Sequence, residues 1–141
     1  MLGTRICLLL ALVGSTSVAT AVDYTVPAGV TVLNEEQLLT QVIGSTFNGG
    51  TRWIEYYEPP TGDLKEGTIK GKGEGSGPYI ASWTIKDSLM CWRYKGYMAS
   101  YDGCYTIALD GNNATFYKAD GTIYNDPAGR IKLISGNPKS L

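Results

Sequence analysis

The chain of 141 residues contains no histidine. Histidine is the usual general base near neutral pH and a common ligand of zinc and copper. Its absence excludes Ser-His-Asp and Cys-His nucleophile systems as well as His-ligated metal sites. Only carboxylate, lysine and tyrosine chemistry is left for catalysis, so we expect no metal ion and no cofactor.

The sequence also lacks an excess of positive charge. It has 12 basic and 13 acidic residues, a net charge of −1. Proteins that bind the phosphate backbone carry a basic patch or stripe and a high isoelectric point. We therefore expect no nucleic-acid partner.

Long apolar runs are missing apart from one short run near the N-terminus. Residues 1–21 combine a cation at Arg5, an apolar run that ends before Gly14, and small residues at Ala19 and Ala21. A membrane-spanning helix needs about 20 apolar residues, whereas this pattern is typical of a cleaved signal peptide. We expect the mature chain to begin at Val22, to be periplasmic or secreted, and to have no membrane partner after cleavage.

Cysteine is scarce, with three residues in all. Cys7 would leave with the signal peptide, so the mature chain keeps Cys91 and Cys104. An even number in an exported chain predicts one disulfide, with two free thiols as the alternative. If the two cysteines face one another on antiparallel strands, Arg93 lies opposite Asp102.

A short helix is predicted near the start of the mature chain. Residues 22–33 show no periodicity and are predicted to be a flexible leader. Asn34 and Gln37 have the spacing of a capping box, and Gly44 suits a left-handed helix end. The apolar stripe of this helix must pack on another element, because a helix of this length is marginal alone.

Period-two alternation and turn residues predict antiparallel sheet after Gly50. The fold class is therefore mainly β, a small antiparallel barrel or strongly curved meander of seven to eight strands preceded by one short N-terminal helix, and residues 34–141 form a single domain. An open meander is the alternative to closure. The strands are expected at 52–58, 67–70, 79–85, 89–94, 104–109, 115–118, 122–124 and 130–134, with a flexible link at 71–78.

Two features suggest chemistry only weakly. Paired carboxylates could serve a glycosidase, but Glu55 and Glu58 lie three apart on a strand and point to opposite faces, so they are interpreted as solvated polar residues. The glycine-rich stretch 71–77 lacks the spacing of a phosphate-binding loop and leads into a strand. No catalytic residue is therefore assigned.

Aromatic residues with a polar tip are abundant, with ten Tyr and three Trp against two Phe. Such rings suit half-buried positions, where they stack on sugars or anchor protein partners. The candidate ligand or partner surface consists of Trp92, Tyr94, Tyr97 and Tyr101. Ordinary packing of rings in the sheet is the alternative interpretation.

Several short segments occur in an order that resembles a family of small exported proteobacterial proteins, the domain-of-unknown-function family nine-nine-five. They are Ile43-Gly44-Ser45-Thr46, Trp53-Ile54-Glu55-Tyr56-Tyr57, Gly67-Thr68-Ile69, Ser82-Trp83-Thr84-Ile85, Met90-Cys91, Gly103-Cys104-Tyr105, Asp120-Gly121 and Gly136-Asn137-Pro138. The resemblance implies export and a shared fold, and it implies no activity. The chain departs from the pattern at Pro59-Pro60-Thr61, which leaves the register of the first hairpin open.

Three functions are compatible with these features. The first is a non-catalytic binding module for a small molecule, glycan or protein. The second is an inhibitor or envelope-stress accessory protein that acts through the disulfide-bounded loop, and the third is a carboxylate-dependent hydrolase. A closed apolar cavity would favour the first, an ordered protruding loop at 95–101 the second, and two converging buried carboxylates the third.

Overall fold

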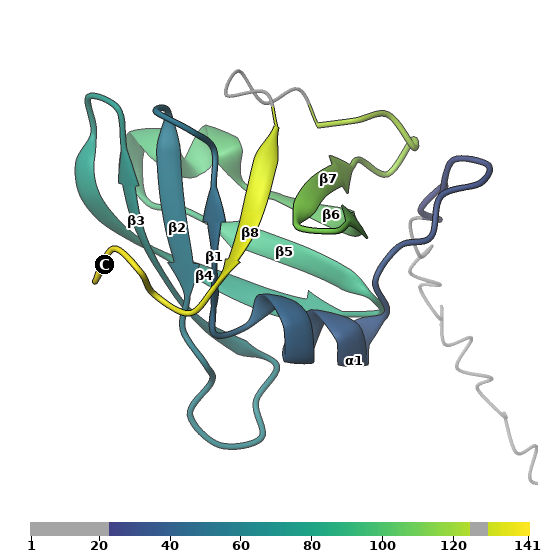
Figure 1. Cartoon of the computed structure of the whole chain (residues 1–141), viewed down its shortest axis with the longest axis horizontal. Helices are drawn as coiled ribbons and strands as arrows, with labels where there is room; N and C mark the ends of the chain where they lie inside the picture. The colour runs from purple at the N-terminus through teal and green to yellow at the C-terminus, as the bar shows by residue number, and fades with distance from the viewer. Residues whose placement is uncertain (1–22, 125–129) are drawn as a thin grey trace, which may run out of the picture.

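The computed structural model describes residues 23–124 and 130–141, so the predicted signal peptide lies outside the described residues. Eight antiparallel strands form a closed barrel in which each strand pairs with its neighbours in sequence, and the first pairs with the last (Figure 1). The strands are β1 (Ser45–Asn48), β2 (Trp53–Tyr57), β3 (Glu66–Gly73), β4 (Gly77–Lys86), β5 (Leu89–Arg93), β6 (Gly103–Asp110), β7 (Asn113–Tyr117) and β8 (Ile131–Ser135). This confirms the predicted fold class and excludes the alternative of an open meander.

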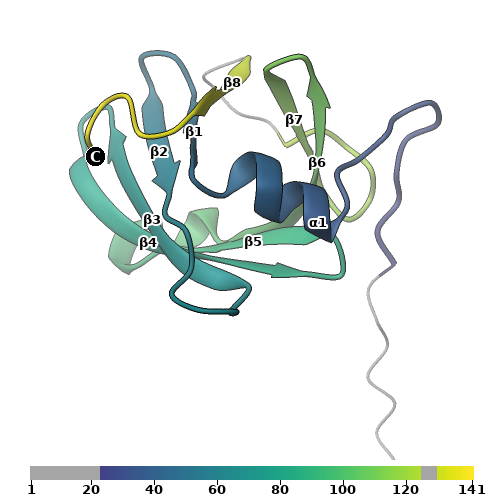
Figure 2. The same ribbon diagram turned by 60° about the horizontal axis from the view of Figure 1, so that its bottom comes forward.

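The N-terminal helix covers one end of the barrel. One α-helical turn, α1 (Glu35–Gln37), continues as the π-helical segment η1 (Leu38–Val42). The capping box between Asn34 and Gln37 is present, with both hydrogen bonds at 2.9 Å. Figure 2 shows the helix lying across the near end of the barrel.

The helix packs on the barrel through its predicted apolar side chains. Leu38 and Val42 are fully buried, and Leu39 and Ile43 are partly buried against the same core. The helix ends at Val42, and Gly44 two residues later has a φ of 80°, the left-handed conformation expected of a glycine after a helix.

The predicted leader contacts the barrel at three points. The Tyr24 hydroxyl donates to the Cys104 carbonyl at 3.1 Å, and the Thr25 N–H donates to the Ala119 carbonyl at 2.9 Å. The Leu33 N–H donates to the Ile107 carbonyl at 2.7 Å. These bonds tie the segment before the helix to β6 and to the region after β7.

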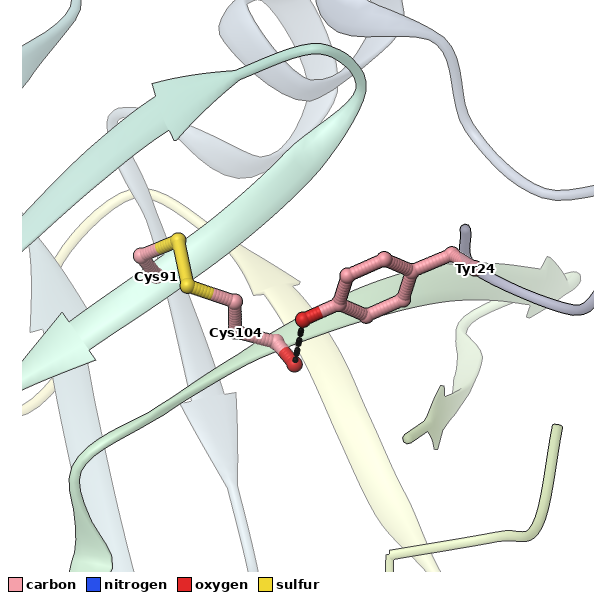
Figure 3. Close-up of a disulfide and its surroundings, with 3 residues drawn as sticks. All are labelled: Tyr24, Cys91 and Cys104. Atoms are coloured by element: carbon pink, nitrogen blue, oxygen red, sulfur yellow. Dashed lines mark hydrogen bonds between the residues drawn. A yellow bond between two sulfur atoms is a disulfide. The ribbon is translucent and has the colours of Figure 1, made fainter. Parts of the chain in front are cut away.

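The disulfide joins β5 and β6, as predicted. Cys91 and Cys104 are directly paired, with 3.9 Å between their Cα atoms (Figure 3). The predicted register of these two strands is confirmed over three pairs, but the ladder ends at Trp92 opposite Gly103 and does not extend to the expected pair of Arg93 and Asp102. Asp102 instead accepts a hydrogen bond from the Tyr94 N–H at 2.6 Å.

Three predictions about the sheet need correction. The strand β1 was not expected, yet it closes the barrel by pairing with both β2 and β8. The stretch 71–78 is no flexible link, since most of it belongs to the β3–β4 hairpin, whose ladder continues to Gly73 opposite Gly77. The segment 122–124 forms only a single bridge, between Tyr117 and Ile123.

The face of β4 that was predicted to point into the core is the buried one. Ala81, Trp83 and Ile85 are buried and Tyr79 is partly buried, whereas the intervening Ile80 is exposed. The core is formed by side chains from all eight strands and the helix.

Candidate functional site

A buried carboxylate lies inside the barrel on β2. Glu55 is only 4% exposed, and its two oxygens accept hydrogen bonds from three tyrosines. Tyr57 lies on β2, Tyr79 on β4 and Tyr94 directly after β5. The Tyr57 hydroxyl donates to Oε2 at 3.0 Å, and the hydroxyls of Tyr79 and Tyr94 donate to Oε1 at 2.7 Å each. Burying a carboxylate is costly unless it is well bonded, and these three donors offset that cost.

The strand register explains how Tyr79 reaches Glu55 across an intervening strand. Glu55 of β2 is paired with Gly71 of β3, and Gly71 is paired with Tyr79 of β4. A Cβ atom on Gly71 would lie 2.3 Å from the Tyr79 ring, so the ring occupies the space that a side chain on β3 would take. The absence of a side chain on Gly71 therefore allows the hydroxyl to extend over β3 to the carboxylate.

The same arrangement recurs four residues away. Gly67 of β3 is paired with Trp83 of β4, and a Cβ on Gly67 would lie 2.8 Å from the indole. The Trp83 Nε1–H donates to the Glu58 carbonyl at 3.0 Å. Two glycines on the inner face of β3 thus let two rings of β4 span that strand.

The surroundings of the three tyrosines raise the pKa of their hydroxyl groups. Burial, and then the neighbouring Glu55 carboxylate, raise the pKa of Tyr57, Tyr79 and Tyr94 well above the ordinary value of 10.0. The phenols therefore stay neutral near physiological pH and remain donors to Glu55.

Glu55 and two of its tyrosines, Tyr79 and Tyr94, line a cavity of about 270 Å³. It lies at the end of the barrel that carries the β1–β2 turn, the β3–β4 turn and the 3₁₀ segment η2 (Gly96–Tyr101), which is the unlabelled green coil behind β1 and β2 in Figure 1. The lining is mostly aromatic and comprises Arg52, Trp53, Glu55, Gly73, Glu74, Ser76, Tyr79, Trp92, Tyr94, Tyr97, Met98, Tyr101, Phe116 and Tyr124.

All four residues of the candidate surface lie around this cavity. Trp92 and Tyr94 are buried in its wall, whereas Tyr97 and Tyr101 on η2 are 77% and 52% exposed. The rings of Tyr94 and Tyr101 make an edge contact, with centroids 6.4 Å apart. The predicted loop at 95–101 is thus ordered, and it forms part of the cavity wall.

The charged residues at the mouth are paired with each other. Arg52 Nη1 lies 3.3 Å from Glu74 Oε2, and both side chains are more than half exposed. Glu58 points away from Glu55, as expected, and pairs with Lys70 at 2.7 Å.

Glu55 was missed as a site residue, because its interpretation as a solvated polar residue is wrong. The signal available in the sequence is its place between Trp53 and Tyr57, two positions that also face inward. Among the described residues Glu55 is the only buried carboxylate, so they contain no pair of converging buried carboxylates.

No described helix is long and apolar enough to cross a membrane. Comparisons with protein-family models, with curated proteins and with solved structures yield no match to this chain. The resemblance to the exported proteobacterial family therefore stays a prediction.

Proposed function

We propose that this protein is exported and acts as a non-catalytic binding module that holds a small molecule in the cavity beside η2. The observation that carries the proposal is the buried Glu55 carboxylate, held by three tyrosines in the wall of an aromatic cavity. Ligand sites are typically concave and apolar with a few precisely placed polar groups, and this cavity has that composition.

The energetics of the interior support the same proposal. An eight-stranded barrel is just wide enough to be filled by side chains or to hold one small ligand. A carboxylate and three phenols inside such a barrel add little stability over apolar side chains of the same volume. A binding role gives a reason for their presence.

Export is supported by the Cys91–Cys104 disulfide, because disulfides persist mainly in oxidising compartments. Intact-mass measurement of the protein isolated from its host tests this part. The expected mass is that of a chain beginning at Val22 and two hydrogens below its reduced form. A product that retains Met1 would contradict export.

The binding proposal is tested by blocking the cavity. Ser76 lies at its mouth, whereas Ser82 lies on the exposed face of β4, so Ser76→Trp and Ser82→Trp add the same ring inside and outside the site. Native mass spectrometry of exported protein should detect a bound small molecule in the wild type and in Ser82→Trp, and none in Ser76→Trp. Absence of a bound molecule from the wild type, or its retention in Ser76→Trp, would overturn the proposal.

A second candidate function rests on the exposure of Tyr97. This ring projects from an ordered segment next to the disulfide-linked strands, as expected of a residue that anchors a protein partner. In that case Tyr97→Ala would abolish binding of a protein partner, and Ser76→Trp would leave that binding intact.

A further inference from the structure

The charge of the cavity lining is predominantly negative. Among the described residues, the lining contains one basic side chain, Arg52, and two acidic ones, Glu74 and Glu55. Arg52 and Glu74 form an ion pair with each other at the solvent-exposed mouth. The charge farther inside is that of Glu55, which is buried.

The hydrogen bonds from three phenols favour the ionised form of Glu55. An ionised carboxylate only accepts hydrogen bonds, and Glu55 accepts one from each of three phenols. Each phenol has a single proton to donate. The oxygens of Tyr79 and Tyr94 therefore offer lone pairs to the cavity, so this part of the lining favours a ligand that donates hydrogen bonds or carries positive charge.

The aromatic rings of the lining also favour a positively charged ligand. The face of an aromatic ring carries partial negative charge and attracts a cation within about 6 Å of the ring centroid. Tyr94 and Tyr101 are inclined to each other by 75°, and Trp92 and Tyr124 by 76° with centroids 6.3 Å apart. Each pair is in edge-to-face contact, and all four rings line the cavity, so this part of its wall is aromatic.

We propose that the ligand is a small organic cation, an amine or a quaternary ammonium group, enclosed by the aromatic rings and attracted by Glu55. This inference rests on the proposed binding function and names the class of ligand. A neutral sugar would also stack on the rings, but its hydroxyls require donors as well as acceptors. Around Glu55 the phenol protons are already donated to the carboxylate, and the Trp92 Nε1–H, which has no partner among the described residues, is covered by other atoms.

The test compares three probes of similar size with the oxidised full-length protein. They are choline, its neutral carbon analogue 3,3-dimethylbutan-1-ol, and glucose, each titrated by isothermal calorimetry and followed by tryptophan fluorescence, since Trp53 and Trp92 line the cavity. Choline should bind at least tenfold more tightly than its neutral analogue. Equal binding of the two, tighter binding of glucose, or no binding of choline would overturn the inference.

Two variants and one control test whether choline binds in this cavity. Tyr101→Ala removes one ring from the cavity wall and should weaken choline binding about three- to tenfold, whereas Tyr56→Ala, on the outer face of β2, should leave it unchanged. Glu55→Gln should remove the preference for choline over its analogue. Circular dichroism shows whether Glu55→Gln folds. If it does not, the Tyr101→Ala variant alone tests the proposal, and undiminished choline binding to Tyr101→Ala overturns it.

Failure of this inference can be distinguished from failure of the binding function. A bound molecule that Ser76→Trp excludes, together with no preference for choline, would keep the binding module and reject the cationic ligand. If the native protein carries no bound molecule and choline does not bind, both are rejected.

Discussion

Tyr79 lies over Gly71 and bonds to Glu55, the residue paired with Gly71 on its other side. The ring occupies the place of a side chain, since a Cβ on Gly71 would come within 2.3 Å of it. A glycine on β3 therefore controls a polar contact between β2 and β4.

Gly71→Ala should consequently displace Tyr79 and break its hydrogen bond to Glu55. We expect the free energy of unfolding to fall by about 1–3 kcal/mol, the range for overpacked interiors, measured by urea denaturation. Gly73→Ala is the matched control, because the atom nearest to its Cβ is the Ser76 hydroxyl, which can rotate away. Equal effects of the two substitutions would contradict this role of Gly71.

Replacing the tyrosines of the cluster one at a time tests the hydrogen bonds to Glu55. Tyr57→Phe and Tyr94→Phe each remove one donor to a buried carboxylate while keeping the ring. Each should lower the free energy of unfolding by about 1.5–3 kcal/mol. Tyr56→Phe, on the outer face of the same strand, should change it by less than about 0.5 kcal/mol. If Tyr57→Phe also lowered the free energy of unfolding by less than about 0.5 kcal/mol, its hydrogen bond would not stabilise the buried Glu55 carboxylate.

The raised pKa values of Tyr57, Tyr79 and Tyr94 predict a loss of stability in alkali. In the unfolded chain tyrosine loses its proton near pH 10, whereas in the fold these three keep theirs. Above pH 10 the folded protein therefore binds more protons than the unfolded chain, and its stability falls as the pH rises. Below pH 10 the contribution is fully present.

The expected slope is up to about 4 kcal/mol per pH unit for three tyrosines. Absorbance of tyrosinate at about 295 nm should show a fraction of the tyrosines ionising only together with the loss of β-sheet circular dichroism. Tyr57→Phe should make this slope shallower. Ionisation of all tyrosines before any unfolding would contradict the prediction.

The elements that follow from local patterns were predicted correctly. The capping box at Asn34, the alternation of β4 and the pairing of Cys91 with Cys104 each depend on a few residues whose spacing determines the structure. The grouping of Trp92, Tyr94, Tyr97 and Tyr101 followed from their proximity in sequence.

The features that depend on distant pairing could not be predicted in this way. A barrel was predicted from the need to protect the edges of the sheet, but the strand that closes it was missed, because β1 is only four residues long and pairs with β8 from the opposite end of the domain. The burial of Glu55 depends on Gly71 and Tyr79, whose register is set by two successive hairpins. The local sign of its burial, the place of Glu55 between Trp53 and Tyr57, is ambiguous, because the opposite face of the same strand carries Ile54 and Tyr56.

The disulfide should be a major source of stability. It joins residues 13 positions apart, and closing a loop of about 15 residues contributes roughly 3 kcal/mol in the chain-entropy model. The Cys91→Ser, Cys104→Ser double variant should lose about that amount from its free energy of unfolding, measured in urea. Free thiols in protein isolated from its host would contradict the bridge itself.

The helix at the closed end of the barrel provides the last prediction. Leu38 is fully buried in the common core, whereas the adjacent Leu39 is only partly buried. Leu38→Ala should cost about 2–5 kcal/mol, as expected for a leucine removed from a packed interior. Leu39→Ala has the same chemistry and the same effect on helix propensity, so its smaller cost isolates the contribution of docking. If both substitutions cost less than about half a kcal/mol, the helix is not packed on the barrel in solution, and that end of the interior is open to solvent.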